Sequence, residues 1–219
     1  MALSEGALSV VNSIPFLLRG VSVTLQITFL ALLIGSFFGL VLAVMRVYGG
    51  GISRRLATAY SRVIRSLPLL VILFMLYYAT YGVITMTEFF AVVMGLAVHT
   101  SAYQLEIFRG AIQSIGSGQM EAAQALGMNK IQCIIYVILP QALRKAVPYW
   151  GNEAAIVLKD SSFAFVLGIA DLMRRGQYVS ARTSQLLLTY VTVGLMYLIL
   201  TTLLTRMLSL AESRVKIPE

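Results

Sequence analysis

Long uncharged hydrophobic segments alternate with segments that carry charge along the chain. Residues 21–45, 66–87 and 183–205 contain no charged side chain, and residues 89–105 form a shorter uncharged segment. A helix that crosses a bilayer needs about 20 mostly apolar residues. The pattern therefore predicts four transmembrane helices, joined by connections that hold most of the charge.

A fifth spanning helix is indicated by residues 140–168, although polar groups interrupt this segment. Basic residues gather in three groups, one after each of the first, third and last uncharged segments: Arg46, Arg54, Arg55, Arg62 and Arg65; Arg109, Lys130, Arg144 and Lys145; Arg206, Arg214 and Lys216. Basic connections tend to face the cytoplasm. Five helices place all three groups there, with the N-terminus outside, whereas Arg174, Arg175 and Arg182 then face outside.

We therefore expect an all-α polytopic membrane protein with a single domain over residues 1–219. The expected spans are listed in chain order: approximately 20–46, 62–85, 87–112, 140–168 and 183–209. Pro68 is expected in the first turn of a helix or at a kink. Gly35 and Gly39 form a GxxxG pattern, which is more often a helix-packing feature than a functional one.

Composition agrees with an integral membrane protein. The 219 residues are 58% hydrophobic and only 12% charged, with a mean hydropathy of +0.84, whereas soluble domains carry about 25% charged residues. The net charge of +8 is then explained by basic cytoplasmic connections rather than by a nucleic-acid partner. The single Cys133 excludes an internal disulfide, and the single His99 argues against a histidine-based metal site.

A polar segment between the hydrophobic ones predicts a short cytoplasmic helix at approximately 119–132. It holds helix-forming residues and no proline, with Gly127 as a break or a point of close approach. Ala122, Ala123 and Leu126 give it a small apolar face. Such a helix either lies on lipid or docks in the groove of a partner. Its small residues and the acidic Glu121 favour docking.

The same segment carries a recognisable spacing: E-A-A, three residues, Gly, nine residues, then V-I-L-P. The matching positions are Glu121, Ala122, Ala123, Gly127, Val137, Leu139 and Pro140. This pattern resembles the EAA loop of ABC-importer permeases, with Val137 in place of isoleucine. Residues 102–128 and 158–172 are similar to the polar amino acid branch of that family. The resemblance extends from about residue 15 to 210.

The resemblance implies a type I ABC importer permease fold in a bacterial cytoplasmic (inner) membrane. It also implies a second permease subunit (identical or different), two cytoplasmic ATP-binding subunits and an external solute-binding protein. The EAA segment would be the coupling helix that sits in a cleft of the ATPase, with these coupling residues: Glu121, Ala122, Ala123, Leu126, Gly127, Leu139 and Pro140. The chain has no GxxxxGK[ST] phosphate-binding loop. ATP and Mg are therefore expected on the partner, and no cofactor or enzyme activity on this chain.

Polar side chains within the predicted spans are candidates for a substrate pathway, because such groups are costly in lipid. The candidates are His99, Thr100, Ser101, Tyr103, Gln104, Glu106, Glu153, Lys159 and Asp160. Helical spacing places His99, Tyr103 and Glu106 on one face, and Glu153 and Asp160 on another. The carboxylates could accept hydrogen bonds from the ammonium group of an amino acid, and the hydroxyls or Lys159 could donate to its carboxylate.

Structural roles compete with these assignments. Glu106 and Arg109 have the spacing of an ion pair within one helix. Lys159 suits a structural position or contact with a neighbouring subunit, and His99 fits either a hydrogen-bonded interior or a pore lining. For Asp160 the pathway and the structural role are equally favoured.

The sequence thus favours the membrane subunit of an ATP-driven importer for polar amino acids, with basic ones among the candidates, working by alternating access. An ion-coupled secondary carrier that uses Asp160, Glu153 and Glu106 is the alternative, although five spans without an inverted repeat argue against it. An intramembrane enzyme has little support, because the chain has one histidine and neither G-x-S-x-G nor HExxH.

Overall fold

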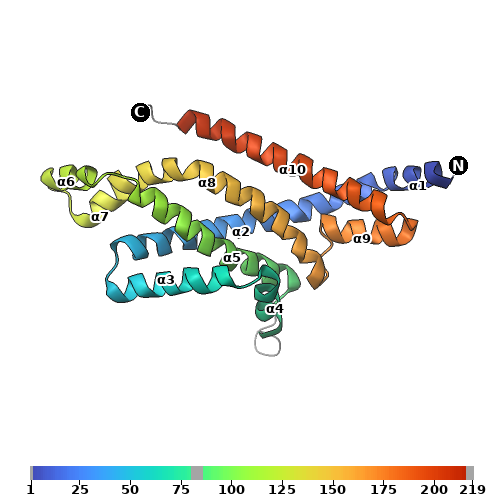
Figure 1. Cartoon of the computed structure of the whole chain (residues 1–219), viewed down its shortest axis with the longest axis horizontal. Coiled ribbons are helices and arrows are strands. Elements are labelled where there is room, and N and C mark those ends of the chain that lie inside the picture. The colour runs from blue at the N-terminus through green and yellow to red at the C-terminus, as the bar shows by residue number, and fades with distance from the viewer. Residues whose placement is uncertain (1, 80–85, 216–219) are drawn as a thin grey trace. The chain divides into compact units, whose positions relative to one another are not determined.

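The computed structural model describes residues 2–79 and 86–215, and every regular element in that part of the chain is helical (Figure 1). Residues 80–85 of the second predicted span and the basic residue Lys216 lie outside the described residues. The elements are α1 (Ala2–Val11), α2 (Ile14–Tyr48), α3 (Gly51–Ser66), α4 (Leu69–Ala79), α5 (Glu88–Gln113), α6 (Ser117–Ala125), α7 (Lys130–Gln132), the π-helix η1 (Cys133–Ile138), α8 (Leu139–Asp160), the 3₁₀-helix η2 (Ser161–Leu167), α9 (Leu172–Thr183) and α10 (Leu186–Val215).

The chain divides into two compact units. The first unit consists of Met1–Leu33, Pro68–Ala97 and Ala154–Leu204, and the second of Ile34–Leu67, Val98–Glu153 and Thr205–Glu219. The helices α2, α5, α8 and α10 each contribute to both units.

The core of the first unit joins α2, α9 and α10 through buried apolar side chains. These are Leu17, Leu172, Val179 and Val193. Gly20 lies so close to α9 that a Cβ placed there would be 2.7 Å from the Cα of Leu172. A side chain at that position would therefore separate the two helices.

The core of the second unit joins α2, α5, η1 and α8. Its buried members are Ala43, Phe108, Ala111, Ile112, Ile138, Ala142 and Ala146. Small alanines on α8 let the backbones approach closely. Gly39 does the same for α2, since a Cβ there would lie 2.8 Å from the Cβ of Gln104 on α5. The helix-packing interpretation of the GxxxG pattern is confirmed at Gly39.

Two helical stretches are long and apolar enough to cross a membrane: Gly6–Tyr48 and Leu186–Leu210. A third candidate consists of α3 and α4, which are separated by a break. Helices α5 and α8, which carry the polar candidate residues, are not among these stretches, so the assignment of five spans is still a prediction.

The predicted second span, 62–85, is not one continuous helix in its described part. Helix α3 ends at Ser66, Leu67 is extended with φ −93° and ψ 136°, and α4 begins at Leu69. The cause is Pro68, which has no N–H to donate and forces the preceding residue out of the helical region. The sequence placed Pro68 at a first turn or a kink, and the structure shows both: it precedes α4, and its carbonyl accepts from the N–H of Val71.

Candidate functional site

Helix α6 ends in a turn that requires glycine. The N–H of Gly127 donates to the carbonyl of Gln124 at 2.9 Å, and the N–H of Met128 donates to that of Ala123 at 3.2 Å. This pair of bonds is the Schellman motif, whose C′ residue takes a left-handed conformation. Gly127 has φ +85°, and a Cβ there would meet nothing within 4 Å. Its role inside this chain is therefore the turn, not close packing.

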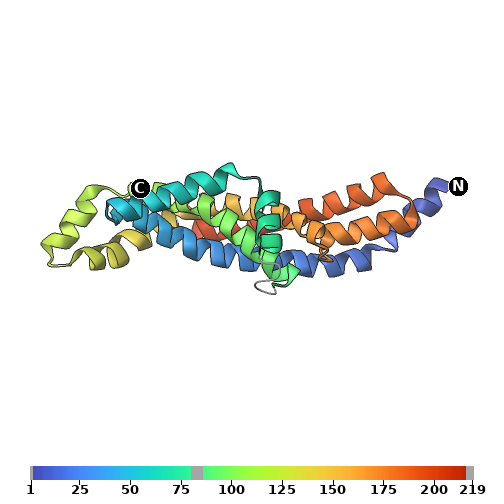
Figure 2. The same cartoon turned by 90° about the horizontal axis from the view of Figure 1, so that it is seen from below.

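The predicted helix 119–132 consequently forms two shorter helices rather than one. Helix α6 begins at Ser117 and ends at Ala125, and α7 begins at Lys130. Asn129 caps α7: its side chain accepts from the N–H of Gln132, and the Gln132 side chain accepts from the N–H of Asn129. Glycine and this capping box stop one helix and start the next. The two helices meet at the turn of residues 126–129 (Figures 1 and 2).

The predicted coupling residues on α6 and its end fall on opposite faces. Ala123 is buried, on a helix that packs against η1. Glu121, Ala122 and Gly127 are exposed, and Leu126 is 85% exposed. Among the described residues, Leu126 has the largest exposed fraction of any large apolar side chain, so it is accessible to another molecule.

The two other predicted coupling residues lie beyond the π-helix. Leu139 is partly buried and packs against the core of the second unit, whereas the side chain of Pro140 is exposed. The π-helix η1 ends directly before Leu139. Because proline cannot donate the usual helical hydrogen bond, a wide turn just before it accommodates Pro140 without ending the helix. Leu139 thus fixes the segment to the core and is not part of the exposed face.

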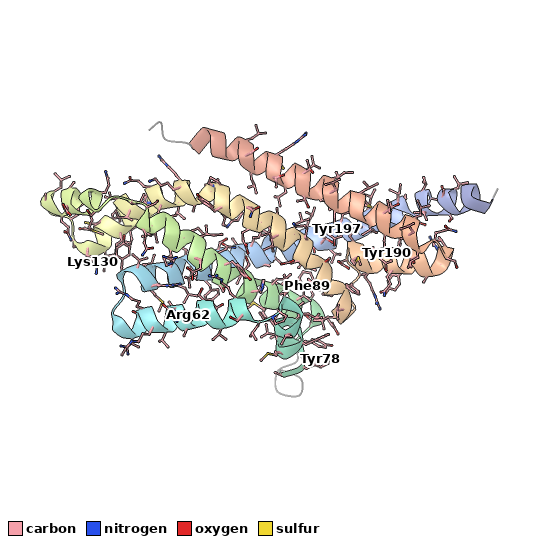
Figure 3. The ribbon with its side chains drawn as sticks, in the orientation of Figure 1. Arg62, Tyr78, Phe89, Lys130, Tyr190 and Tyr197 are labelled. Carbon is pink, nitrogen blue, oxygen red and sulfur yellow. The ribbon has the colours of Figure 1, made fainter. Side chains whose placement is uncertain are left out.

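Polar contacts attach the α6 region to the longer helices. The Gln141 side-chain amide donates to Gln119 Oε1 at 3.1 Å, and Lys145 Nζ donates to the carbonyl of Ser114 at 3.2 Å. Lys130 Nζ donates to the carbonyl of Tyr48 at 3.4 Å; Figure 3 labels Lys130 at the start of α7. These bonds connect the ends of α2, α5 and α8 around α6.

A chain of hydrogen bonds joins several predicted pathway residues inside the second unit. Thr100 Oγ1 donates to Glu153 Oε1 at 2.8 Å, and Gln104 Nε2 donates to Thr100 Oγ1 at 3.2 Å. Trp150 Nε1 contacts both Gln104 Oε1 at 3.1 Å and Ser36 Oγ at 2.9 Å. Thr100, Gln104 and Glu153 are buried. The structure thus brings three of the candidates together in one polar network, which we call the α5–α8 network.

Three other candidates make contacts outside this network. The hydroxyls of Ser101 and Tyr60 are 2.6 Å apart, and Ser101 also donates to the carbonyl of Val98 at 2.8 Å. The rings of His99 and Tyr103 lie 5.0 Å apart, with the Arg65 guanidinium 5.4 Å from the centroid of the Tyr103 ring. The helical spacing of His99 and Tyr103 correctly indicated that they share a face.

Glu106 sits among three arginines. Arg109 Nε lies 2.9 Å from Glu106 Oε2, which confirms the ion pair within α5, and Arg65 Nη1 lies 3.3 Å from Glu106 Oε1. Arg46 of α2 forms a further ion pair with Glu106. Ser61 Oγ also donates to Glu106 Oε1 at 2.6 Å. This carboxylate ties α2 and α3 to α5, which is an arrangement suited to holding helices rather than receiving an ammonium group.

Lys159 and Asp160 belong to the first unit and are the last two residues of α8. Lys159 is exposed and Asp160 is half-buried. Glu153 belongs to the second unit. Asp160 and the α5–α8 network thus belong to different units.

One buried carboxylate was not among the sequence candidates. Asp171 is fully buried; it caps α9 by accepting from the N–H of Arg174 at 2.8 Å, and Tyr197 OH lies 3.5 Å from its Oδ2. Figure 3 labels Tyr197 on α10. Burial raises the pKa of Asp171 to about 6, against the lowering effect of its hydrogen bonds. An aspartate just before a helical segment is an N-cap signal that could have identified it.

These features define the class of protein. The fold is all-α with apolar helices of spanning length, and a short capped helix presents an exposed leucine beside a coupling-loop pattern. They describe a helical membrane protein whose short helix α6 is exposed beside a pattern that resembles a coupling loop.

Comparison with known proteins defines the family. The profile of the "Binding-protein-dependent transport system inner membrane component" family matches residues 35–217, and the chain belongs to this family. It is 38% identical over 208 residues to the glutamine transport system permease protein GlnP of Escherichia coli (strain K12), covering 94% of this chain and 95% of the relative. It is 34% identical to the nopaline transport system permease protein NocM of Agrobacterium fabrum, covering 93% and 89%.

A solved structure agrees with the fold. The chain matches one described as "Crystal structure of an amino acid ABC transporter with histidines" with a TM-score of 0.85 and 37% identity, over 94% of this chain and 97% of that one. The predicted all-α fold of an ABC importer permease is therefore confirmed. The chain is a membrane permease component, not an enzyme, and works in a system that depends on a binding protein and a separate ATPase.

Proposed function

We propose that this chain forms the translocation pathway of an ABC importer for polar amino acids. The observation that carries the proposal is α6 itself: an exposed helix, held by a Schellman turn, with Leu126 85% exposed at its end. Relatives named for the transport of glutamine and of nopaline support an amino acid or a related molecule as the substrate.

The proposed assembly contains two permease subunits, two cytoplasmic ATP-binding subunits that hold ATP and Mg, and one external solute-binding protein. In this arrangement the chain crosses the inner membrane five times, with its N-terminus outside and its C-terminus in the cytoplasm. The basic residues around the first and third predicted connections support this orientation, because they then face the cytoplasm.

The contacts of the second unit suggest how movement passes from α6 to the pathway. Gln119 bonds to Gln141 of α8, and Ser114 after α5 bonds to Lys145. A partner that displaces α6 would therefore pull on α5 and α8 together. The same two helices carry Thr100 and Glu153 of the α5–α8 network. Closure of the ATPase pair would in this way reach the polar residues of the pathway.

We also propose which residues contact the substrate, from their burial and their hydrogen bonds. Asp160, half-buried at the end of α8, is our first choice as acceptor for the ammonium group. Thr100, Gln104 and Glu153 would line or support the pathway, with Ser101, His99, Tyr103 and Lys159 as further candidates. We assign Glu106 to positioning, because three arginines already surround its carboxylate.

The proposal is tested with Leu126→Asp and a matched control, Ile131→Asp, in the complex reconstituted in proteoliposomes. Both side chains are well exposed, at 85% and 67%, so neither change should unfold the chain. We expect Leu126→Asp to lose the ATP-binding subunit on purification and to lose substrate-stimulated ATP hydrolysis, while the control keeps both. Amino acid uptake driven by an ion gradient, without any ATPase, would refute the importer and support a secondary carrier.

A further inference from the structure

A polar pocket lies in the first unit, where α1 and the residues that follow it meet the turn between α9 and α10. Figures 1 and 2 show α1 beside this turn. The pocket has a volume of about 580 Å³, in the range of pockets that hold small molecules. Such pockets are usually lined by hydrophobic side chains, whereas every described side chain that lines this one is polar. These side chains are Ser9, Asn12, Ser13, Arg182, Thr183 and Gln185. The pocket therefore suits a charged or polar group better than an apolar one.

Arg182 is the one charged side chain that lines the pocket in the described part of the chain. Its Nη2 donates to Ser13 Oγ at 2.8 Å, and the same hydroxyl donates to the carbonyl of Ser9 at 2.8 Å. Because Ser13 is buried, these bonds fix the position of the guanidinium. None of the ion pairs found among the described residues involves Arg182. A guanidinium has five N–H donors, so the bond to Ser13 leaves donors for an anion.

The turn that carries Arg182 and Gln185 has a strained backbone. Ser184 has φ 56° and ψ 20°, a left-handed conformation that residues other than glycine adopt only at a cost. The Thr183 hydroxyl accepts from the N–H of Gln185 at 3.3 Å across this turn. Gly6 lets α1 approach closely, since a Cβ there would lie 2.7 Å from Cδ of Gln185. Strain of this kind persists where surrounding contacts hold it, and it often marks a ligand site.

The pocket lies at the start of a membrane-spanning helix. The apolar stretch Leu186–Leu210 is long enough to cross a membrane, and Gln185 directly precedes it. Each headgroup layer of a bilayer is about 5–8 Å thick and lies outside a hydrocarbon core of about 30 Å. A residue just before a spanning stretch is therefore at the level of the lipid phosphates. Leu186 and Leu187 are exposed at the same end of α10, where acyl chains can cover them.

The composition of the lining selects the kind of headgroup. An arginine binds phosphate through two parallel hydrogen bonds, and the side-chain amides of Asn12 and Gln185 can donate to further oxygens. None of the described lining side chains is a carboxylate, so none receives the cationic group of a zwitterionic phospholipid. A phospholipid with a net negative charge is therefore favoured over a zwitterionic one.

We propose that this pocket binds the headgroup phosphate of an anionic phospholipid. Arg182 donates to the phosphate oxygens, and Leu186 and Leu187 lie along the acyl chains. The bound lipid ties α1 to the turn between α9 and α10. Because lipid binding is measured without transport, failure of this proposal is separable from failure of the proposed import function.

The test titrates the purified complex of permease and ATP-binding subunits, stripped of lipid in detergent, with phosphatidylglycerol or with phosphatidylcholine. Native mass spectrometry gives the affinity of the most tightly bound lipid for each permease subunit, and we expect phosphatidylglycerol to bind more tightly. A basic residue near an anionic lipid contributes about a fivefold factor in binding. Arg182→Gln should therefore weaken the binding of phosphatidylglycerol about fivefold at low salt. Asn12→Trp, at an exposed position, should weaken it with no change of charge, because the indole fills the pocket.

The matched control is Arg19→Gln, because Arg19 is also exposed in the first unit but does not line the pocket. This variant should bind phosphatidylglycerol as the wild type does. Arg182→Lys keeps the charge and should retain most of the affinity. Equal losses in Arg182→Gln and Arg19→Gln, or no preference for phosphatidylglycerol in the wild type, would overturn the proposal.

Two further measurements separate the lipid from other occupants of the pocket. Inorganic phosphate is added to the wild type and to Arg182→Gln, and thermal unfolding is followed. Stabilisation of the wild type alone, without binding of phosphatidylglycerol, would make the pocket a site for a soluble anion and would refute the lipid. Stimulation of ATP hydrolysis by the solute-binding protein is measured on the same variants. Its loss in Arg182→Gln with an unchanged lipid affinity would also refute the lipid and make the pocket a protein-docking surface.

Discussion

The Thr100 hydroxyl donates to the Glu153 carboxylate at 2.8 Å and thereby joins α5 to α8 through two buried side chains. A buried carboxylate that loses a hydrogen-bond donor bears the cost of its own desolvation. The bond therefore stabilises the second unit as well as positioning two candidate pathway residues.

Replacing Thr100 with valine should lower the free energy of unfolding by about 1–3 kcal/mol, since the shape is kept while Glu153 loses a donor and Gln104 Nε2 loses an acceptor. The matched control is Thr192→Val, whose hydroxyl bonds only to the carbonyl of Leu188 in its own helix. Thermal unfolding in detergent micelles measures both. Equal effects of the two substitutions would show that the bond to Glu153 contributes nothing specific.

The arginine cluster predicts a salt-dependent effect on stability at Glu106. Glu106→Gln leaves Arg46, Arg65 and Arg109 together without their shared carboxylate. We expect a loss of about 1–3 kcal/mol in unfolding free energy, because the site is partly exposed and solvent screens the charges. Raising the salt concentration should narrow the difference from wild type, since salt screens the repulsion among the arginines. The surface control Glu88→Gln should cost less than about 0.5 kcal/mol.

Because Gly39 of α2 packs closely against α5, we expect one added methyl group there to destabilise the chain. Its Cβ would lie 2.8 Å from the Cβ of Gln104 and 3.0 Å from the carbonyl oxygen of Ser101. Gly39→Ala should therefore force α2 and α5 apart and destabilise the chain by about 1–3 kcal/mol. Gly194→Ala, in α10, meets nothing within 4 Å and should be neutral or stabilising. Similar unfolding temperatures for the two variants would rule out the close contact.

The parts of the fold that sequence could predict are those governed by local pattern. The charge-free residues 21–45 lie within the single helix α2. The second span was expected as one helix because hydropathy does not register backbone geometry, whereas Pro68 and the extended Leu67 break it. Gly127 was expected as a break or a close approach, and its positive φ shows the break.

The contacts of the candidate site also include some that sequence could predict and some that it could not. His99 with Tyr103 and Glu106 with Arg109 are separated by about one helical turn, so spacing alone indicated their contacts. Trp150 and Ser36 are 114 residues apart, and their hydrogen bond depends on how α2 packs against α8. No local pattern encodes such a contact, which is why sequence identified members of the α5–α8 network without its connections.

The buried Asp171 predicts a pH-dependent stability. Its pKa is raised from 3.8 to about 6, chiefly by burial, so the folded chain binds a proton more tightly than the unfolded chain. The stabilisation that this proton contributes is about 3 kcal/mol. It is fully present below pH 3.8 and is lost as the pH rises through about 6. The unfolding temperature of the wild type should fall across this window.

The Asp171→Asn substitution removes the titrating charge but keeps the helix cap, so it tests the two effects separately. Asparagine can still accept from the N–H of Arg174 but does not titrate, so α9 should stay capped and the unfolding temperature should no longer fall between pH 4 and pH 6. The variant should be more stable than wild type at neutral pH. A wild type that becomes more stable through this window, in parallel with the variant, would contradict the raised pKa.

The end of α6 offers a test of why Gly127 is needed. Alanine pays about 1–2 kcal/mol for a left-handed conformation, whereas asparagine tolerates it better although its side chain is larger. If coupling depends on the left-handed turn, Gly127→Asn should retain more coupling of ATP hydrolysis to transport than Gly127→Ala does. If instead the partner must approach the bare backbone, the smaller alanine should keep more. Gly118→Ala, within α6 with open space around it, serves as the control. Because no described residue other than its two chain neighbours comes within 4 Å of the Gly127 Cβ position, we expect the asparagine variant to couple better.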